Sequence, residues 1–438
     1  MSNRKSAPSA FLVLAAMLGF TLGLGVNRVS AQGTTATILG NVADASGAAI
    51  PDASVEVRNV GTGATQVVSA DAQGRFRVPG LLVGDYEVQV SKVGFSTVVR
   101  KGITLTVGSQ EVVDFSLPVG QKQETVTVEG EASQVETTNS SVVTVTSEQQ
   151  MRELPLNGRN FEQLIQLAPG VTTVQWSTNS KQGRAAEYSV AGGRPEGQAI
   201  LLDDESLQSI TNNGMGSTTG SSLGIEAIDE FQTLTNTYGA QFGGNGAVIN
   251  AVSKSGTNSF HGSAFDFLRN SALDARDFFA TRSTPPAFRR NQYGASLGGP
   301  VKKDKTFFFV DYEGVRQLLE ENKVATVPAC NVSGTCKITA TNPVAARAIA
   351  NVLEVFPAPD TLIGGGQGLA ATYGNQIVHE DYVLSRVDYA LSSKDSIFAR
   401  YLSDKASQLE PYAGGGATGG GPIPDWVNND QSHSQFQP

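Results

Sequence analysis

From Gln292 to Leu297, residues of opposite polarity alternate, and this period of two most limits what the chain can fold into. The alternating sets are Tyr293, Ala295 and Leu297 against Gln292, Gly294 and Ser296. A basic turn, VKKDK, follows, and TFFFVDYE then has the composition of a second strand. Because such alternation gives a strand one apolar and one polar face, the sequence predicts a hairpin in a sheet with two different faces.

The same stretch contains Gly294-Ala-Ser296-Leu-Gly298, which fits the G-x-S-x-G pattern of a hydrolase nucleophile elbow. An elbow needs a buried apolar strand before the serine and a helix after it. Here the charged sequence FRRNQ comes before the serine, and a turn and a strand come after it. We therefore interpret Ser296 as a strand residue and predict no enzyme.

The amino-acid composition favours strands over helices, and the net charge argues against nucleic acid as a partner. The 438 residues include 48 glycines and only four methionines, and this length suggests two to four domains. The net charge of −9 argues against nucleic acid, because a phosphate-binding domain would show a basic face.

The N-terminus has the form of a secretory signal peptide, residues 1–31. Arg4 and Lys5 precede a largely apolar stretch, and Val29-Ser-Ala31 predicts cleavage between Ala31 and Gln32. The alternative is a retained membrane anchor. No later stretch is long and apolar enough for a transmembrane helix, so a mature chain that crosses a membrane would do so as a barrel.

Two cysteines, Cys330 and Cys336, enclose only NVSGT. In an exported protein this close pair predicts a small disulfide-bonded loop. The three histidines, His261, His379 and His433, have no ligand spacing with each other or with the cysteines. We therefore predict no metal site and no cofactor.

Residues 35–118 contain short strands separated by turn signals, which predicts an all-β sandwich. They resemble the carboxypeptidase regulatory-like domain. The matching positions are Gly40, Val42, Asp44, Gly47, Ile50, Ala53, Val55, Asp71, Gly74, Phe76, Val78, Leu81, Gly84 and Tyr86. By fold analogy this domain would be a carbohydrate-binding-like module, and the alternative is a spacer or docking role.

A mixed α/β domain is predicted for residues 135–255. Ser147 with Gln150 forms a capping box for a short helix, and Asn160 with Gln163 is expected to begin a second one that ends at Pro169. The acidic run from Asp203 to Glu205 has two interpretations, a cation site or a solvated loop.

Several motifs of this middle region resemble the plug domain of TonB-dependent outer-membrane receptors, and with the flanking segments they are similar to the Oar-like branch. They are LNGRN, PGV, GGR, LDD, IDEF, YGAQFGG, VIN and SKSG. The resemblance implies a plug that fills a barrel, and a short box before it that a TonB-type periplasmic partner captures. The segment Glu124, Thr125, Val126, Thr127, Val128 lies in the linker 119–134, where that box belongs.

Residues 256–438 are predicted to form the first strands of an antiparallel transmembrane β-barrel. Apolar residues such as Val310 and Tyr312 would face outer-membrane lipid, while Asp311 and Glu313 would face the lumen. The segments Thr281–Arg290 and Glu320–Gln376 are expected to be irregular extracellular loops. A plugged barrel needs about 22 strands, so we expect a C-terminally truncated chain that cannot close a pore alone.

The sequence therefore predicts a mainly β, multidomain protein of the cell outer membrane whose N-terminal domain lies in the periplasm. The resemblance implies a receptor and active transporter for an extracellular glycan, siderophore or peptide, with a TonB-type protein as partner. The alternative function is a surface adhesin or structural envelope protein, with carbohydrate binding through the sandwich.

Overall fold

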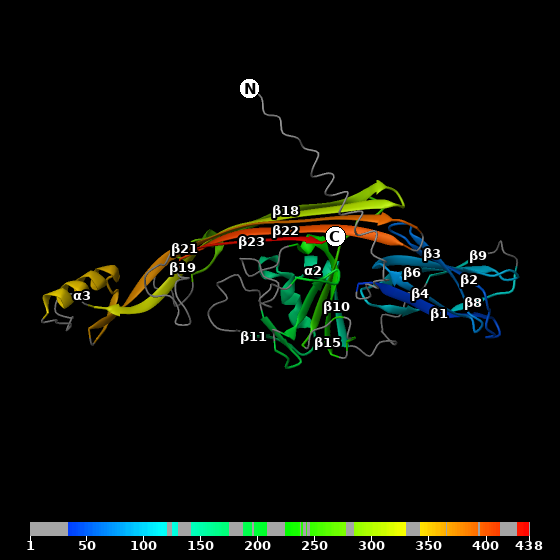
Figure 1. Ribbon diagram of the computed structural model, residues 1–438, viewed down its shortest axis with the longest axis horizontal. Helices are drawn as coiled ribbons and strands as arrows, with labels where there is room; N and C mark the ends of the chain where they lie inside the picture. Colours follow the sequence, from blue (N-terminus) through cyan, green and yellow to red (C-terminus); the bar gives the residue numbers. More distant parts are fainter. Residues whose placement is uncertain are drawn as a thin grey trace, which may run out of the picture. The chain divides into compact units, whose positions relative to one another are not determined.

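The computed structural model describes residues 34–120, 125–129, 142–174, 187–194, 197–207, 224–236, 238–239, 242, 246–276, 284–329, 342–364, 366–392, 395–411 and 427–437. Three groups of strands follow one another along the chain (Figure 1). Within the described residues, no helix combines the length and the apolar character needed to cross a membrane. Ala31, Gln32, Cys330 and Cys336 lie outside the described residues.

The first group is a sandwich of two sheets. Its strands are β1 (Ala36–Asp44), β2 (Ser54–Asn59), β3 (Thr65–Ser69), β4 (Arg75–Leu81), β5 (Gly84–Ser91), β6 (Thr97–Leu105), β7 (Gln110–Val112), β8 (Phe115–Leu117) and β9 (Thr125–Glu129). One sheet has the order β4-β1-β7, with β8 also paired to β1, and the other has the order β3-β2-β5-β6-β9.

The sandwich has a hydrophobic core of its own, formed by the alternating inward residues of both sheets. Ile38 and Val88 are completely buried, and Phe76 and Tyr86 are almost so. The Tyr86 hydroxyl donates to the carbonyl of Leu82 at 2.8 Å, and burial raises the pKa of Tyr86 to about 12. These two aromatic side chains therefore support the core, as the sequence pattern indicated, and are not available to stack on a sugar.

The second group is the middle domain. A five-stranded sheet has the order β10-β15-β16-β13-β14, and β11 pairs with β12 separately. The strands are β10 (Val142–Ser147), β11 (Val171–Val174), β12 (Glu187–Val190), β13 (Ala199–Leu202), β14 (Glu205–Ser206), β15 (Ile228–Asn236) and β16 (Val248–Ser253).

The two helices expected in the middle domain have different outcomes. Helix α2 (Glu148–Glu153) is confirmed, with the capping box of Ser147 and Gln150 complete. The second is a 3-10 helix, Phe161–Leu167, in which the Asn160 side chain accepts from the N–H of Glu162. The expected second helix is therefore present between Asn160 and Pro169, but it is a 3-10 helix and not an α-helix, since apolar residues at i, i+3 and i+4 fit both helix types.

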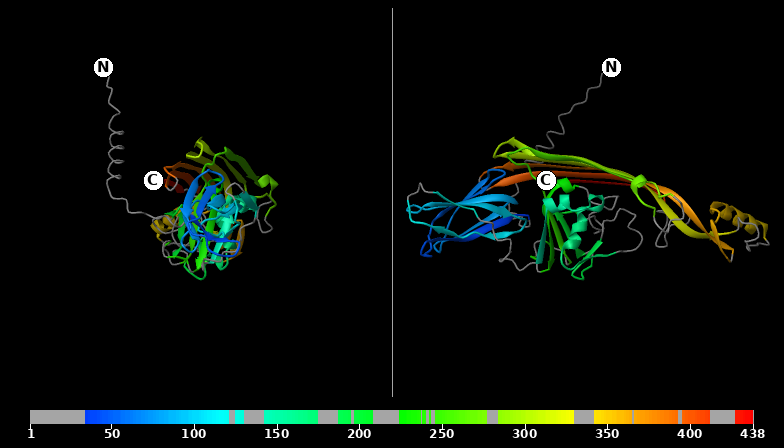
Figure 2. Two further views of the ribbon diagram at one scale, coloured as in Figure 1. Left: turned by 90° about the vertical axis from the view of Figure 1, so that its right-hand side faces the viewer. Right: turned by 180° about the vertical axis from the view of Figure 1, so that it is seen from behind.

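The third group, the long sheet, has the order β17-β18-β19-β21-β22-β23, with β20 also paired to β21. Its strands are β17 (His261–Asn270), β18 (Phe288–Lys302), β19 (Thr306–Pro328), β20 (Thr361–Gly364), β21 (Gln367–Ala390), β22 (Ser396–Glu410) and β23 (Val427–Gln437). Figure 2 shows these strands side by side in one curved sheet.

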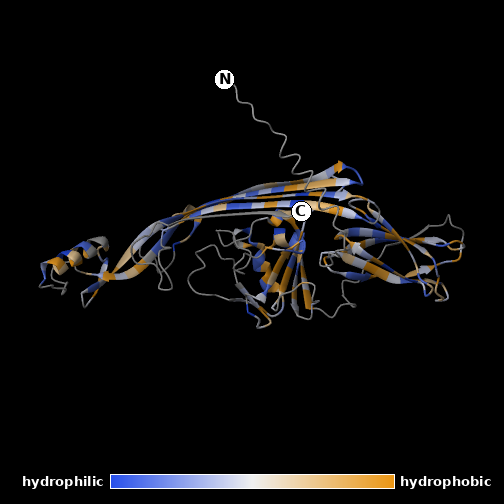
Figure 3. Cartoon of the chain, in the orientation of Figure 1, coloured by the Kyte–Doolittle hydropathy of each residue, from blue (hydrophilic) through white to orange (hydrophobic). Residues whose placement is uncertain are grey.

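The two faces of the long sheet differ as the alternation predicted. On β19, Asp311 and Glu313 are buried, at 0% and 1% exposed, whereas Val310 and Tyr312 are 41% and 37% exposed. Figure 3 shows the same alternation of hydropathy along the long strands. On β19 the sheet therefore presents Val310 and Tyr312 on its outer face, and Asp311 and Glu313 lie on the opposite, inner face.

The segments expected to be irregular loops contain regular structure. β18 begins at Phe288, and β19 and β21 pair continuously out to Pro328 and Gln367. Helix α3 (Pro343–Val355) lies between them, with Asn342 as its N-cap. The expectation of irregular loops was therefore wrong for the described parts of these segments, because strand pairing continues beyond the residues in which alternation is clear.

The separate core of the sandwich leads to a stability prediction. In the fragment of residues 34–120, Ile38→Ala should lower the free energy of unfolding by about 3 kcal/mol, because it leaves a cavity in a closed core. Val67→Ala is the matched control, since Val67 is 54% exposed and its loss should cost less than about 0.5 kcal/mol. Urea unfolding measures both, and equal effects would show that this core is not autonomous.

Candidate functional site

The candidate site begins at a two-residue turn in the middle domain. Leu202 pairs with Glu205 at the end of the β13–β14 hairpin, which leaves Asp203 and Asp204 as the turn. Both have positive φ, 49° and 67°. Aspartate tolerates this conformation better than most residues, and a turn of this kind matches the twist of a hairpin.

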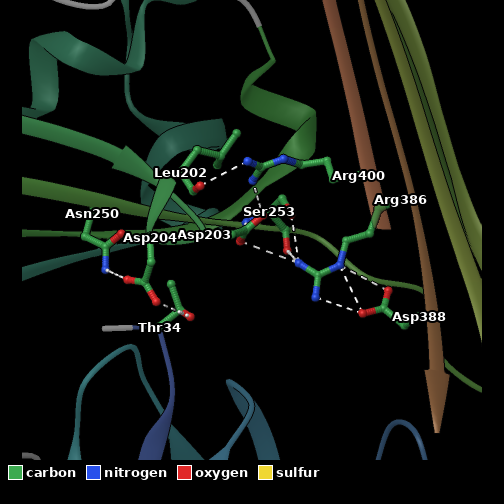
Figure 4. A network of polar contacts seen from close by, with 9 residues as sticks. All are labelled: Thr34, Leu202, Asp203, Asp204, Asn250, Ser253, Arg386, Asp388 and Arg400. Atoms are coloured by element: carbon green, nitrogen blue, oxygen red, sulfur yellow. Dashed lines mark hydrogen bonds and ion pairs between the residues drawn. The ribbon is translucent and has the colours of Figure 1, made fainter. Parts of the chain in front are cut away.

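This turn directs Asp203 toward two arginines of the long sheet, Arg386 on β21 and Arg400 on β22 (Figure 4). Arg386 Nη1 lies 3.5 Å from Asp203 Oδ1, and Arg400 Nη1 contacts Oδ2. The three side chains are 4%, 5% and 2% exposed, in the order Asp203, Arg386, Arg400. One buried carboxylate therefore joins the hairpin to two strands of the sheet.

Further hydrogen bonds complete the surroundings of these charges. Ser253 donates to Asp203 through its N–H at 2.9 Å and its hydroxyl at 2.6 Å. Arg386 donates to the Ser253 carbonyl at 3.0 Å and to Asp388 at 2.8 Å, and Arg400 donates to the Leu202 carbonyl at 3.0 Å. We call Asp203, Ser253, Arg386 and Arg400 the aspartate latch.

The contacts of the aspartate latch exclude both interpretations that the sequence allowed for Asp203, a cation site and a solvated loop. Its oxygens are occupied by arginine and serine donors, so this side chain belongs neither to a cation site nor to a solvated loop. Asp204 accepts from Asn250 Nδ2 at 3.2 Å and from Thr34 Oγ1 at 3.1 Å. Within the described residues, no group of three or more His, Cys, Asp or Glu side chains is placed to hold a metal ion.

A second polar contact joins the middle domain to β17 through Glu226, which is 3% exposed. Arg159 Nη2 lies 2.8 Å from Glu226 Oε1, and the Ser263 hydroxyl donates to Oε2 at 2.7 Å. Ser263 and Ser296 share a hydrogen bond of 2.9 Å. Ser296 is therefore a strand residue in a structural chain of hydroxyls, in agreement with the rejection of the elbow.

The environment of Glu226 keeps it charged. Burial alone would raise its pKa, but the hydrogen bonds from Ser263 and Arg159 and the charges of Lys254 and Arg152 outweigh burial and hold the pKa below its ordinary value of 4.5. Arg159 also lies 4.0 Å above the ring of Phe265, which adds a cation–π contact.

An apolar cluster accompanies these polar contacts. It contains middle-domain residues such as Phe161, Phe231 and Ile249, together with Phe309 and Leu384 from the inner face of the long sheet. The middle domain and the sheet therefore share one core.

The predicted box has a defined backbone, although Glu124 lies outside the described residues. Thr125, Val126, Thr127 and Val128 belong to β9, which pairs in parallel with β6. The sequence analysis did not identify the contact of Arg386 with Asp203, and it did not identify Arg400 as a site residue. The signal was present in the alternation of SIFARYL, which puts Arg400 on the inner face of the return strand.

Three family models match the chain in succession. The carboxypeptidase regulatory-like domain matches residues 37–118, the TonB-dependent receptor plug domain matches residues 135–248, and the outer membrane beta barrel domain matches residues 252–437. The sandwich, the middle domain and the long sheet correspond to these matches in that order.

Two curated relatives and one solved structure are similar to the chain. The TonB-dependent transporter Oar of Myxococcus xanthus is 28% identical over 294 residues, which are 64% of this chain and 26% of that protein. The probable TonB-dependent siderophore receptor PirA of Acinetobacter baumannii is 26% identical over 192 residues, 42% of this chain and 24% of that protein. The outer membrane transporter YddB from Escherichia coli is 17% identical, with a TM-score of 0.37, over 61% of this chain and 33% of that chain. The chain thus spans about a quarter of the length of the curated relatives it matches.

The aspartate latch leads to a mutational prediction. Asp203→Asn removes the charge between two buried arginines and should destabilise the contact between middle domain and sheet by about 3 kcal/mol. Glu205→Gln is the matched control, because it makes the same charge change at an exposed position of the same hairpin. Thermal unfolding and trypsin cleavage of the purified chain in detergent measure the effect. Equal behaviour of the two variants would contradict the role of the latch.

The Glu226 contact leads to a pH prediction. A carboxyl whose folded pKa is lowered stabilises the fold above its unfolded pKa of about 4.5, and this contribution is lost as pH falls through the lowered value. Melting temperatures of the wild type should therefore fall more steeply on acidification below that pH than those of Glu226→Gln. Parallel curves for the two proteins would show that Glu226 is not the group responsible.

Proposed function

We propose, from the three domains of a TonB-dependent receptor that this chain carries, that it binds an extracellular ligand at the outer membrane and imports it with energy from a TonB-type partner. In this proposal the middle domain is the plug, the long sheet is part of the barrel wall, and the sandwich lies in the periplasm. The export signal is cleaved between Ala31 and Gln32. No catalytic step is assigned.

One observation carries the proposal, namely the way in which the plug is attached to the wall. The shared apolar cluster keeps the plug on the inner face of the barrel strands, while the latch and the Glu226 contact fasten it through polar groups. Polar contacts are suited to a plug that must separate from the barrel wall during import. When the two separate, water can replace each hydrogen bond between them. A purely apolar interface would give no such exchange.

The ligand class remains open among siderophores, glycans and peptides. The name of the relative PirA refers to siderophores, which makes a siderophore the first class to test. Uptake of all three classes, compared between a wild-type and a deletion strain, identifies the ligand. The cysteine pair, Cys330 and Cys336, stays a prediction of a disulfide in an extracellular loop.

The box gives the mechanistic test. A partner that captures an extended segment gains affinity from main-chain hydrogen bonds, and proline lacks the N–H that such bonds need. Val126→Pro should therefore lower binding of the periplasmic domain of the host's TonB-type protein at least about tenfold, measured by titration with the purified chain.

Val126→Thr is the matched control, since it keeps the N–H and the β-branched shape, and it should bind as the wild type does. If Val126→Pro binds with unchanged affinity, capture through this box is wrong, and the adhesin or structural role becomes the better assignment.

A further inference from the structure

The sandwich contacts the long sheet through the turn between β2 and β3, residues 60–64. The N–H of Asn258 donates to the carbonyl of Gly61 at 2.9 Å. Asn258 lies in the connection from β16 to β17, and its side chain donates to Asp304 at 2.7 Å. Asp304, in the turn between β18 and β19, donates from its N–H to Asn258 Oδ1 at 2.8 Å. The sandwich is thus joined to the end of a hairpin of the long sheet.

The fit between the β2–β3 turn and this hairpin is close. The side chain of Asn59 accepts from the N–H of Thr62 at 2.8 Å and fixes the shape of the turn. A Cβ atom placed on Gly63 would lie 2.3 Å from Asp304 Oδ1. Non-bonded heavy atoms prefer separations of about 3.5–4.0 Å, so a side chain at this position would push the hairpin away. Gly63 therefore allows the sandwich turn to reach the hairpin turn.

A second turn of the sandwich, residues 106–109 between β6 and β7, contacts the plug. The N–H of Val107 donates to a carboxylate oxygen of Glu230 on β15. Val107 and Glu230 are buried, at 2% and 8% exposed. A Cβ atom on Gly108 would lie 3.2 Å from Oε1 of Gln232, which is the next residue on the same face of β15. This turn therefore packs directly on a strand of the plug sheet.

The two turns belong to one unit. β2 and β6 both pair with β5 in the same sheet, and Val55 of β2 and Ile103 of β6 lie in the sandwich core. A close-packed core transmits a displacement rather than absorbing it, so one turn cannot move far without the other. The plug therefore cannot move away from the wall while both turns keep their contacts.

We infer that the sandwich is an intramolecular clamp, whose β2–β3 turn holds the wall and whose β6–β7 turn holds the plug. The clamp rests on the proposed function in one respect, since import requires the plug to separate from the wall. It gives the sandwich a regulatory role, because undocking of one of the two turns must precede that separation. A sandwich that is only a spacer would leave the plug equally stable whether docked or undocked.

A disulfide lock tests the docked arrangement. In a background with Cys330→Ser and Cys336→Ser, the pair Gly61→Cys and Thr257→Cys should form a disulfide, because the two Cβ positions lie 3.8 Å apart. Gly80→Cys with Thr257→Cys is the control and should stay reduced, since a Cβ on Gly80 would meet no atom beyond its chain neighbours within 4 Å. Failure of the first pair to oxidise would overturn the clamp.

The lock should also stabilise the plug. Amide hydrogen exchange of the purified full chain in detergent, followed on peptides that cover β15, should be at least about threefold slower in the oxidised protein than in the reduced one. The physical reason is that β15 must separate from the Val107 turn before it can open, and the lock holds this turn in place. Equal exchange in both states would show that the sandwich is a spacer.

Gly63→Leu tests the clamp in the opposite direction. The leucine should displace Asp304 and undock the β2–β3 turn, so exchange of β15 should become at least about threefold faster than in the control. Gly80→Leu is the matched control, because Gly63 and Gly80 have nearly the same φ, 72° and 74°, and a side chain strains the backbone equally at both. Equal exchange in the two variants would overturn the clamp.

These measurements need neither a ligand nor the TonB-type partner. The failure of the clamp and the failure of the proposed function are therefore distinguishable. Equal exchange rates of β15 overturn the clamp, whereas unchanged partner binding by Val126→Pro overturns capture through the box.

Discussion

The attachment of the plug depends on one carboxylate between two like charges. Arg386 and Arg400 are direct cross-strand partners on β21 and β22, and like charges in this position repel each other. Both are buried, so water cannot screen them. Asp203 lies against both guanidinium groups, and Asp388 supplies a second negative charge beside Arg386. The carboxylate of the plug therefore stabilises the arginine pair of the sheet, and the arginine pair in turn binds the plug. The turn at Asp203 and Asp204 holds this carboxylate in place.

Sequence was sufficient for the architecture because alternation is a local signal. The hairpin at Gln292, the exposed Tyr312 and the buried Asp311 all follow from a period of two within a few residues. The latch could not be predicted in this way. Asp203 and Arg400 are 197 positions apart, and the sequence LLDDES does not indicate which distant residues bind Asp203. The 3-10 type of the helix at Phe161 was missed for a related reason. Its residues at i, i+3 and i+4 fit both helix types, and packing decides between them.

The plug–wall interface combines two kinds of contact that differ in how they resist opening. Phe309 and Leu384 belong to the shared apolar cluster, whose separation exposes apolar surface to water. The contacts of Glu226 with Ser263, and of Arg290 with the Gly158 carbonyl at 3.3 Å, exchange protein partners for water. The net free energy of a hydrogen bond to a charged group is about 1.5–3 kcal/mol. The apolar cluster and the polar contacts therefore both stabilise the interface, and the polar contacts also fix the position of the plug on the sheet.

If the proposed function holds, the strand order of the plug determines where a pull on the box would act first. The chain enters the plug sheet at β10, which is an edge strand and pairs with β15. The latch lies at the β13–β14 hairpin on the opposite edge, beyond β15 and β16. In that proposal, force applied through the box would load the β10–β15 hydrogen bonds before it reached Asp203. Because β10 contributes only six residues to the sheet, it can detach while the latch still holds β13 against the wall. Under the proposed function, this topology would favour stepwise opening of the plug from β10 inward over release of the plug as one body.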